Sequence, residues 1–119
     1  MLNREKLLTY VNKKYETIPE RPWITSPKNE VLRHNDSKKW YAIIMEISAN
    51  KLGLNTTKKI DILNVKNSPE FIDFLLSNKE KVYPAYHMNK KHWITIILDG
   101  SIEDEKVYNL IETSFNMTL

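Results

Sequence analysis

The stretch Lys39-Trp40-Tyr41-Ala42-Ile43-Ile44-Met45-Glu46-Ile47 predicts the strand from which the rest of the fold can be built outward. Successive side chains of a strand point to opposite faces of a sheet, so the stretch divides its side chains into two sets. One face is predicted to carry Tyr41, Ile43, Met45 and Ile47, and the other Trp40, Ala42, Ile44 and Glu46.

Two further strands are predicted on either side of this stretch. Glu30–His34 precedes it, and the small polar residues Asn35-Asp36-Ser37 supply a tight reversal between the two. On the other side a loop at residues 51–55 leads into the apolar run Lys58–Lys66. Three consecutive strands joined in this way predict an antiparallel meander.

The N-terminal segment has apolar residues at helical spacing, namely Leu7, Leu8, Val11 and Tyr15. This amphipathic helix is expected to end before Pro19. The segment Thr17–Lys28 contains three prolines, which rule out a helix or an inner strand. It is therefore predicted to be an extended connection, pinned to the core by Trp23.

The second half of the chain adds helices on either side of two strands. Ser68-Pro69-Glu70 is a strong helix start, with a buried stripe predicted at Phe71, Ile72, Leu75 and Leu76. Strands are predicted at Val82–Ala85 and His92–Leu98. Ser101 and Asp104 resemble a capping box for a last helix, whose apolar positions are Val107, Leu110, Ile111 and Phe115.

The predicted element order is α-β-β-β-α-β-β-α, an α+β fold in which helices pack on an antiparallel sheet. The length of 119 residues is common for one domain and allows a sizeable core. No repeat or low-complexity segment interrupts the chain, so residues 1–119 are predicted to form a single domain.

The composition favours an intracellular protein, and the charged residues are unevenly distributed along the chain. There are no cysteines, no signal-peptide pattern and no run long enough to cross a bilayer, so we expect a cytoplasmic protein without a membrane partner. Lysine and arginine number 18 against 15 acids. Residues 28–66 carry eight basic side chains and four acids, whereas residues 99–112 carry five acids and one lysine. Such a polarity can orient an approaching polyanion.

The sequence offers little catalytic machinery. With only two glycines it cannot form a dinucleotide-binding fingerprint or a phosphate-cradling loop. His87 and His92 have a spacing unsuited to a shared metal, and no serine or threonine lies in a glycine-flanked nucleophile turn. We therefore predict a protein that is not an enzyme and that has no metal and no cofactor.

Basic and aromatic residues alternate in two places. One is Lys38-Lys39-Trp40-Tyr41, and the other runs from Tyr83 to Trp93. Nucleic-acid surfaces combine cations for phosphates with flat rings for bases. Against this stands the ordinary interpretation that strand aromatics pack in the core and that paired lysines protect a sheet edge.

Several segments resemble the MmcQ/YjbR family. They include Pro22-Trp23, residues 31–34 and 39–42, the loop 51–54, and Asp61-Ile62-Leu63-Asn64-Val65-Lys66. The longest is Pro84-Ala85-Tyr86-His87-Met88-Asn89-Lys90-Lys91-His92-Trp93-Ile94-Thr95. The resemblance covers the chain from about Pro22 to the last helix.

This resemblance implies a compact bacterial α+β protein, similar to secretion chaperones in its element order and described for the family as a double-wing DNA-binding arrangement. It implies no activity and supplies no catalytic residues. The exposed tip Met88–Lys91 is where a wing would meet phosphate. The competing interpretation is that Tyr86, His87, Asn89 and Trp93 form a hydrogen-bonded corner that closes the sheet.

The leading prediction is a DNA-binding protein whose lysines contact phosphates and whose rings reach bases. Its candidate residues are Lys38, Lys39, Trp40, Lys58, Lys59, Tyr86, His87, Asn89, Lys90, Lys91 and Trp93. A protein-interaction or chaperone-like module with an exposed sheet face is the first alternative. A small-molecule pocket near Tyr86, His87, Asn89 and Trp93 is the second.

Overall fold

In the computed structural model, which describes residues 2–78 and 80–119, five antiparallel strands form one sheet. The strands are β1 (Glu30–Arg33), β2 (Trp40–Ser48), β3 (Lys59–Lys66), β4 (Tyr83–Pro84) and β5 (Trp93–Ile97). Their spatial order is β1-β2-β3-β5-β4. The predicted meander is therefore confirmed as β1-β2-β3, while β5 returns beside β3 and leaves β4 at the edge.

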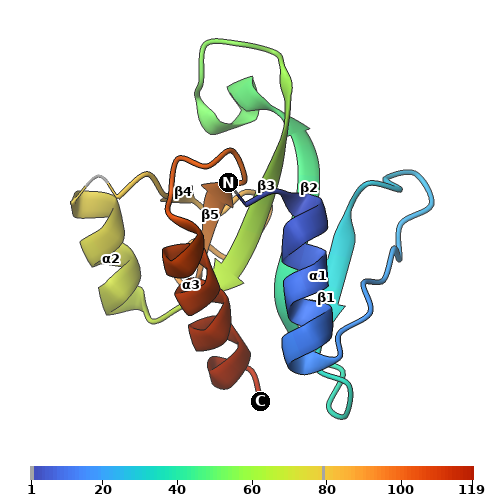
Figure 1. The fold of residues 1–119 in the computed structure, drawn as a ribbon. Helices are drawn as coiled ribbons and strands as arrows, with labels where there is room; N and C mark the ends of the chain where they lie inside the picture. The colour runs from blue at the N-terminus through green and yellow to red at the C-terminus, as the bar shows by residue number, and fades with distance from the viewer. Residues whose placement is uncertain (1, 79) are drawn as a thin grey trace.

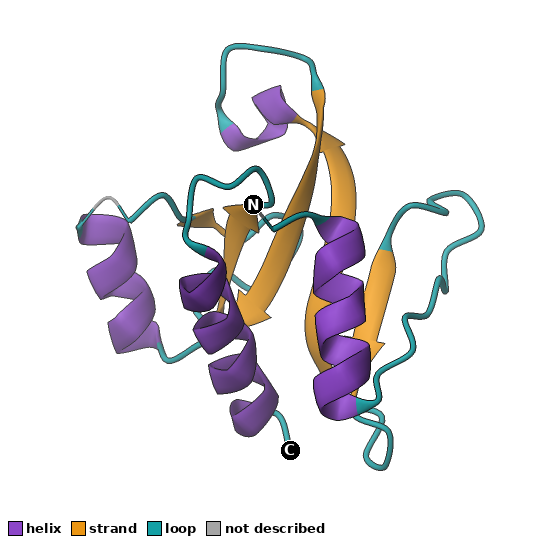
Figure 2. Cartoon of the chain, in the orientation of Figure 1, coloured by secondary structure: helices purple, strands orange, loops and turns teal. Residues whose placement is uncertain are grey.

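Three helices lie side by side on one face of this sheet (Figures 1 and 2). They are α1 (Arg4–Tyr15), α2 (Pro69–Ser77) and α3 (Asp104–Met117), and a short 3₁₀ helix, η1 (Ala49–Leu52), follows β2. The predicted α+β class and element order are confirmed. Because the α-helices of the described residues are all on the same side (Figure 1), no α-helix of that part of the chain covers the opposite face of the sheet, which we call the helix-free face.

Apolar side chains form a cluster on each side of the sheet. The larger cluster lies between helices and sheet and includes Leu7, Val11, Ala42, Ile44, Leu63, Val65, Ile72, Ile94, Ile96 and Ile111. The smaller one centres on Ile47, Ile62 and Ile97 and is bordered by Met45, Leu52, Leu54, Ile60, Tyr83 and Tyr86. The residues that border the smaller cluster come from strands, loops and the short η1 rather than from an α-helix, and its three central side chains are buried.

One of the two predicted helix caps is confirmed and the other is wrong. Ser68 caps α2 as predicted, since its hydroxyl accepts the Phe71 N–H at 3.2 Å. The predicted capping box of Ser101 and Asp104 is wrong: α3 starts after Glu103 without a side-chain cap. The Asp104 carboxylate instead accepts the Leu2 N–H at 2.9 Å, so it ties the N-terminal segment to α3.

Two aromatic residues predicted to be buried are partly exposed. Trp23 is 38% exposed and packs edge to face against Trp40 with ring centroids 5.9 Å apart, so it is not pinned to the helix-side core. Phe71 is 41% exposed and lies parallel to Phe74. Helix α2 buries only a narrow stripe centred on Ile72 and Leu75, because it sits at one side of the helix layer (Figure 1).

The alternation predicted for residues 39–47 is wrong at its first positions. The β1–β2 register pairs Leu32 with Ala42 but Arg33 with Trp40, so Tyr41 is an extra residue opposite β1. As a result Tyr41 joins Ala42 and Ile44 in the helix-side core, and Trp40 moves to the helix-free side near Ile43. Burial of Tyr41 raises the pKa of its hydroxyl to about 12.

The C-terminal end of α3 is held by a buried histidine. His34, 3% exposed, places its Nε2 2.8 Å from the hydroxyl of Thr118, which in turn donates to the Ser114 carbonyl. Its ring also lies against Phe115 and Tyr41. The cluster joins the turn after β1 to the last turn of α3.

Acidification is expected to weaken the fold through His34. Burial lowers its pKa below 6.5, with Lys39 acting in the same direction and Asp36 and the Phe115 backbone against it. The unfolded chain therefore binds more protons than the folded one below pH 6.5, so the free energy of unfolding falls as pH decreases from there towards the lowered pKa. Urea unfolding at about pH 7.5 and about pH 5.5 measures this loss. His34→Gln should flatten the dependence, and an equal slope in both proteins would contradict the assignment.

Candidate functional site

The helix-free face is shaped by the segment that joins β4 to β5. Tyr86 donates its N–H to the Thr95 hydroxyl at 2.8 Å, and its carbonyl accepts from the Asn64 amide at 3.1 Å. The Thr95 hydroxyl donates to the Asn64 side-chain oxygen. Asn64 and Thr95 are fully buried, so this polar network fastens the start of the connection to the centre of the sheet.

The remainder of the connection is an ordered turn. The Asn89 carbonyl accepts from the N–H groups of His92 and Trp93, and its side chain accepts the Lys91 N–H at 2.9 Å. His87 has a left-handed φ of 57° and stacks on Tyr86 with centroids 4.0 Å apart. These contacts agree with the hydrogen-bonded corner, and the same corner presents His87, Lys90 and Lys91 to solvent.

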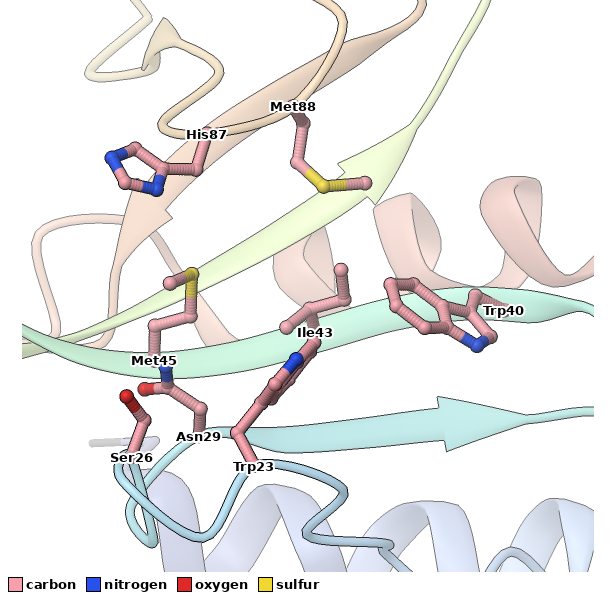
Figure 3. A pocket seen from close by; sticks show the side chains of 8 residues that line it. All are labelled: Trp23, Ser26, Asn29, Trp40, Ile43, Met45, His87 and Met88. Carbon is pink, nitrogen blue, oxygen red and sulfur yellow. The ribbon is translucent and has the colours of Figure 1, made fainter.

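A hollow between this corner and the 23–29 segment forms the first candidate site, which we call the tryptophan slot. It has a volume of about 300 Å³ and is lined by Trp23, Ser26, Asn29, Trp40, Ile43, Met45, His87 and Met88. Figure 3 shows Ile43 and Met45 rising from β2 as its floor, with both indole rings approaching Ile43. His87 and Met88 lie across from Trp23.

A second hollow of about 380 Å³ adjoins the slot on the same face. Its lining residues are Lys51, Leu52, Tyr83, Pro84, Ala85, Tyr86, His87 and Lys90. His87 lines both hollows. Lys51 of η1 and Lys90 of the β4–β5 connection are far apart in the sequence, yet both line this hollow, and the tryptophan slot lies next to them.

Charge is divided between the two faces of the sheet. The acids on the strands are Glu30, Glu46 and Asp61, and all three border the hollow around Arg4 of α1 on the helix side. On the opposite side Arg33 lies over the ring of Trp40, 5.4 Å from its centroid. None of the residues that line the two hollows of the helix-free face is acidic. Among the described strand residues, the helix-free face thus carries apolar and aromatic side chains and no carboxylate.

The lysines predicted as phosphate contacts do not form one group. Lys38 and Lys39 precede β2, whereas Lys58 and Lys59 lie at the start of its antiparallel neighbour β3. At about 3.3 Å per residue these two pairs are at opposite ends of the sheet, roughly 26 Å apart. Lys39 also donates to the carbonyl of Leu119 at 3.1 Å. Of the predicted lysines, Lys90 lines the second of the two hollows described above, and the others line neither of the two.

The predicted aromatic residues lie closer together than the predicted lysines do. Trp40 and His87 line the slot, and Tyr86 and His87 line the second hollow. Trp93 also belongs to the helix-free side of β5, since Ile94 and Ile96 point into the helix-side core. Asn89 serves the turn itself rather than lining either hollow.

Sequence reasoning missed several lining residues. Ser26, Asn29, Met45 and Lys51 were absent from the predicted site, and Trp23 was assigned to the core. Trp23 could have been suspected, because it is a large ring in a proline-rich connection that no periodic pattern places in the core. Nothing in the local sequence brings Lys51 beside Lys90, since that contact depends on the sheet order.

Other kinds of site receive no support from the described residues. Within residues 2–78 and 80–119, no group of three or more histidine, aspartate or glutamate side chains could hold a metal ion. No helix in that part of the chain has the length and apolar character needed to span a membrane.

Comparison with known sequences gives consistent matches. The model of the YjbR family matches residues 12–117. YyaQ of Bacillus subtilis (strain 168), an uncharacterised protein, is 47% identical over 99% of each chain. YjbR of Escherichia coli (strain K12), also uncharacterised, is 30% identical and aligns with 81% of this chain and 80% of its own.

Comparison with solved structures extends the agreement to the fold. A crystal structure from Pseudomonas syringae has a TM-score of 0.93 and 42% identity, covering 99% of this chain and all of the other. A Deinococcus radiodurans protein has a TM-score of 0.72 at 21% identity, covering 98% and 78%. The second likeness concerns the fold alone. None of these names specifies a ligand or a reaction.

Proposed function

The chain belongs to the YjbR family, and from this premise we propose that it is a DNA-binding protein that acts by binding rather than by catalysis. One observation carries the proposal: the helix-free face joins aromatic side chains with Lys51 and Lys90 and has no carboxylate in its hollows. Cations for phosphates beside rings for bases are the combination found on nucleic-acid surfaces.

The geometry reduces the set of residues that we assign to contacts with DNA. Lys51, Lys90 and Lys91 are the proposed phosphate contacts, because the first two line the second hollow and Lys91 is exposed beside Lys90 at the tip of the corner. Trp40 is the proposed base contact. Lys38, Lys39, Lys58 and Lys59 lie at the ends of the sheet and are assigned to contacts with a longer strand.

Removing two rim lysines tests the proposal. Anisotropy titrations of labelled single-stranded and duplex DNA at two salt concentrations should show binding that weakens steeply with salt. Lys51→Ala/Lys90→Ala should bind more weakly whatever the DNA sequence. It should also lower the magnitude of the salt slope by about 1.4 on a single strand, because two phosphate contacts are lost.

The matched control is Lys13→Ala/Lys106→Ala, which removes the same charge from helices on the other side of the sheet. The control should retain the wild-type salt slope. Absence of binding to either DNA at low salt would overturn the proposal, and so would an equal loss of affinity in the two double variants.

A further inference from the structure

The walls of the tryptophan slot are suited to a flat, uncharged ring. Two indole rings, the Met45 and Met88 side chains and Ile43 supply most of its surface, and no lysine, arginine, aspartate or glutamate lines it. Arg33 braces Trp40 and is itself paired with Glu20 at 2.8 Å. The slot therefore offers stacking and dispersion contacts and no lysine, arginine or carboxylate charge.

Polar groups in the slot are free to bind a ligand. The side chains of Ser26 and Asn29 make no hydrogen bond to the described residues 2–78 and 80–119, although their backbones pair with each other. A carboxamide offers both donors and an acceptor, and a hydroxyl offers one of each. Figure 3 shows Asn29 and Ser26 on the same side of the slot as Trp23, next to Met45.

The volume limits the occupant to a small ligand. About 300 Å³ lies at the lower end of the range of roughly 300–1,000 Å³ that small-molecule pockets occupy. A single ring system with donors and acceptors on its edge fits the lining. Nucleobases have this chemistry, since each has two π-faces for stacking and an edge that pairs with amide groups.

We infer that the tryptophan slot binds one unpaired nucleobase between the 23–29 segment and the Tyr86–Lys91 corner. Where that base belongs to a strand, the inference rests on the DNA-binding function proposed above. His87 lines both hollows, so the base in the slot and a phosphate near Lys51 and Lys90 would be neighbours.

The inference predicts a preference for single strands. A base in a duplex has both faces stacked and its pairing edge occupied, and extruding it costs a few kcal/mol. A single strand presents the same base with little such cost. The protein should therefore bind unpaired DNA more tightly than duplex DNA of equal length.

The test measures the contribution of one base to affinity separately from that of the phosphates. One single-stranded oligonucleotide has abasic residues throughout, and a second of equal length carries one adenine at its centre. Wild-type protein should bind the adenine-bearing strand about five- to a hundredfold more tightly, as expected for one stacked base. Trp40→Ala should remove this difference, and Asn29→Ala, which keeps every tryptophan, should reduce it about threefold.

Phe74→Ala is the matched control, because it removes an exposed aromatic ring from the helix layer. It should keep the full preference for adenine. Circular dichroism establishes that each variant is folded before it is titrated. Equal binding of the two strands by wild-type protein would overturn the inference for strands, and so would a preference that survives in both slot variants.

Titration with free adenosine shows whether the slot binds a free nucleoside or only a base that belongs to a strand. Quenching of tryptophan emission by adenosine, diminished in Asn29→Ala, would mean that the slot also takes a free nucleoside, even if no oligonucleotide binds. A preference for the adenine-bearing oligonucleotide without quenching by adenosine would mean that the slot binds only bases that belong to a strand. If neither strand preference nor quenching is seen, the inference is wrong, whereas salt-dependent binding of the abasic strand would still support the proposed DNA-binding function.

Discussion

Replacing Asn64 by alanine is expected to lower the free energy of unfolding by about 2–4 kcal/mol. Asn64 is fully buried, and its side chain bonds both the Tyr86 carbonyl and the Thr95 hydroxyl. The alanine variant leaves these groups without their partner inside the protein, and each unsatisfied buried group costs about 1–3 kcal/mol. Urea unfolding measures the loss.

The same variant should loosen the corner that carries His87 and Lys90. The Tyr86 N–H, which donates to Thr95, should exchange with solvent faster because Thr95 no longer has Asn64 to hold it. Asn109→Ala, an exposed change on α3, is the control and should alter neither quantity. A loss below about 0.5 kcal/mol, the range of ordinary surface changes, would show that the network does not hold the corner.

Arg4→Ala is expected to cost about 2–3 kcal/mol. The guanidinium donates to the Glu30 carboxylate at 3.0 Å, to Asp61 at 2.7 Å and to the Lys28 carbonyl. Glu30 is 3% exposed, so removal of Arg4 leaves a buried carboxylate whose remaining ion-pair partner is the exposed Arg21. The figure lies below the range for breaking a fully buried pair, because solvent reaches Asp61.

Thermal or urea unfolding of Arg4→Ala should be compared with that of Lys13→Ala on the same helix. Lys13 is exposed, so its removal should change stability by less than about 0.5 kcal/mol. If the two variants unfold alike, α1 is held by its apolar residues Leu7 and Val11 alone. A larger loss in Arg4→Ala at low ionic strength than at high would identify Asp61 as the screened partner.

The elements of the fold were predictable because each has a local signal. Apolar spacing marked α1, the serine and proline at positions 68 and 69 marked the start of α2, and the apolar run in residues 58–66 marked β3. Such signals depend on a few neighbouring residues. Sheet order does not, so the position of β5 between β3 and β4 had no local signature.

Errors in the prediction share a physical cause, which is competition between partners that are distant in sequence. Asp104 could cap its own helix, but it accepts the Leu2 N–H instead. Trp23 could enter the core, but it finds Trp40 on the other side of the sheet. Neither choice is visible until the chain is folded.

The candidate site was predictable in its residue types more than in its arrangement. Trp40, Tyr86, His87 and Lys90 were named from their interleaving and do border the hollows of one face. Lys38 and Lys39, which lie at one end of the sheet, satisfied the same pattern, because composition cannot tell which end of a strand a charge occupies. Ser26 and Asn29 carried no signal, since short polar residues are common in connections.

Trp40 lies beside the slot because β2 has one extra residue opposite β1, and not because of the chemistry of its own side chain. Because Tyr41 is the extra residue at the β1–β2 bulge, removing one residue between Arg33 and Ala42 would restore strict alternation and turn Tyr41 outward. Gaps are therefore more informative than substitutions when relatives are aligned over this segment. A homologue with a one-residue deletion there should lack the indole wall even if its tryptophan is retained.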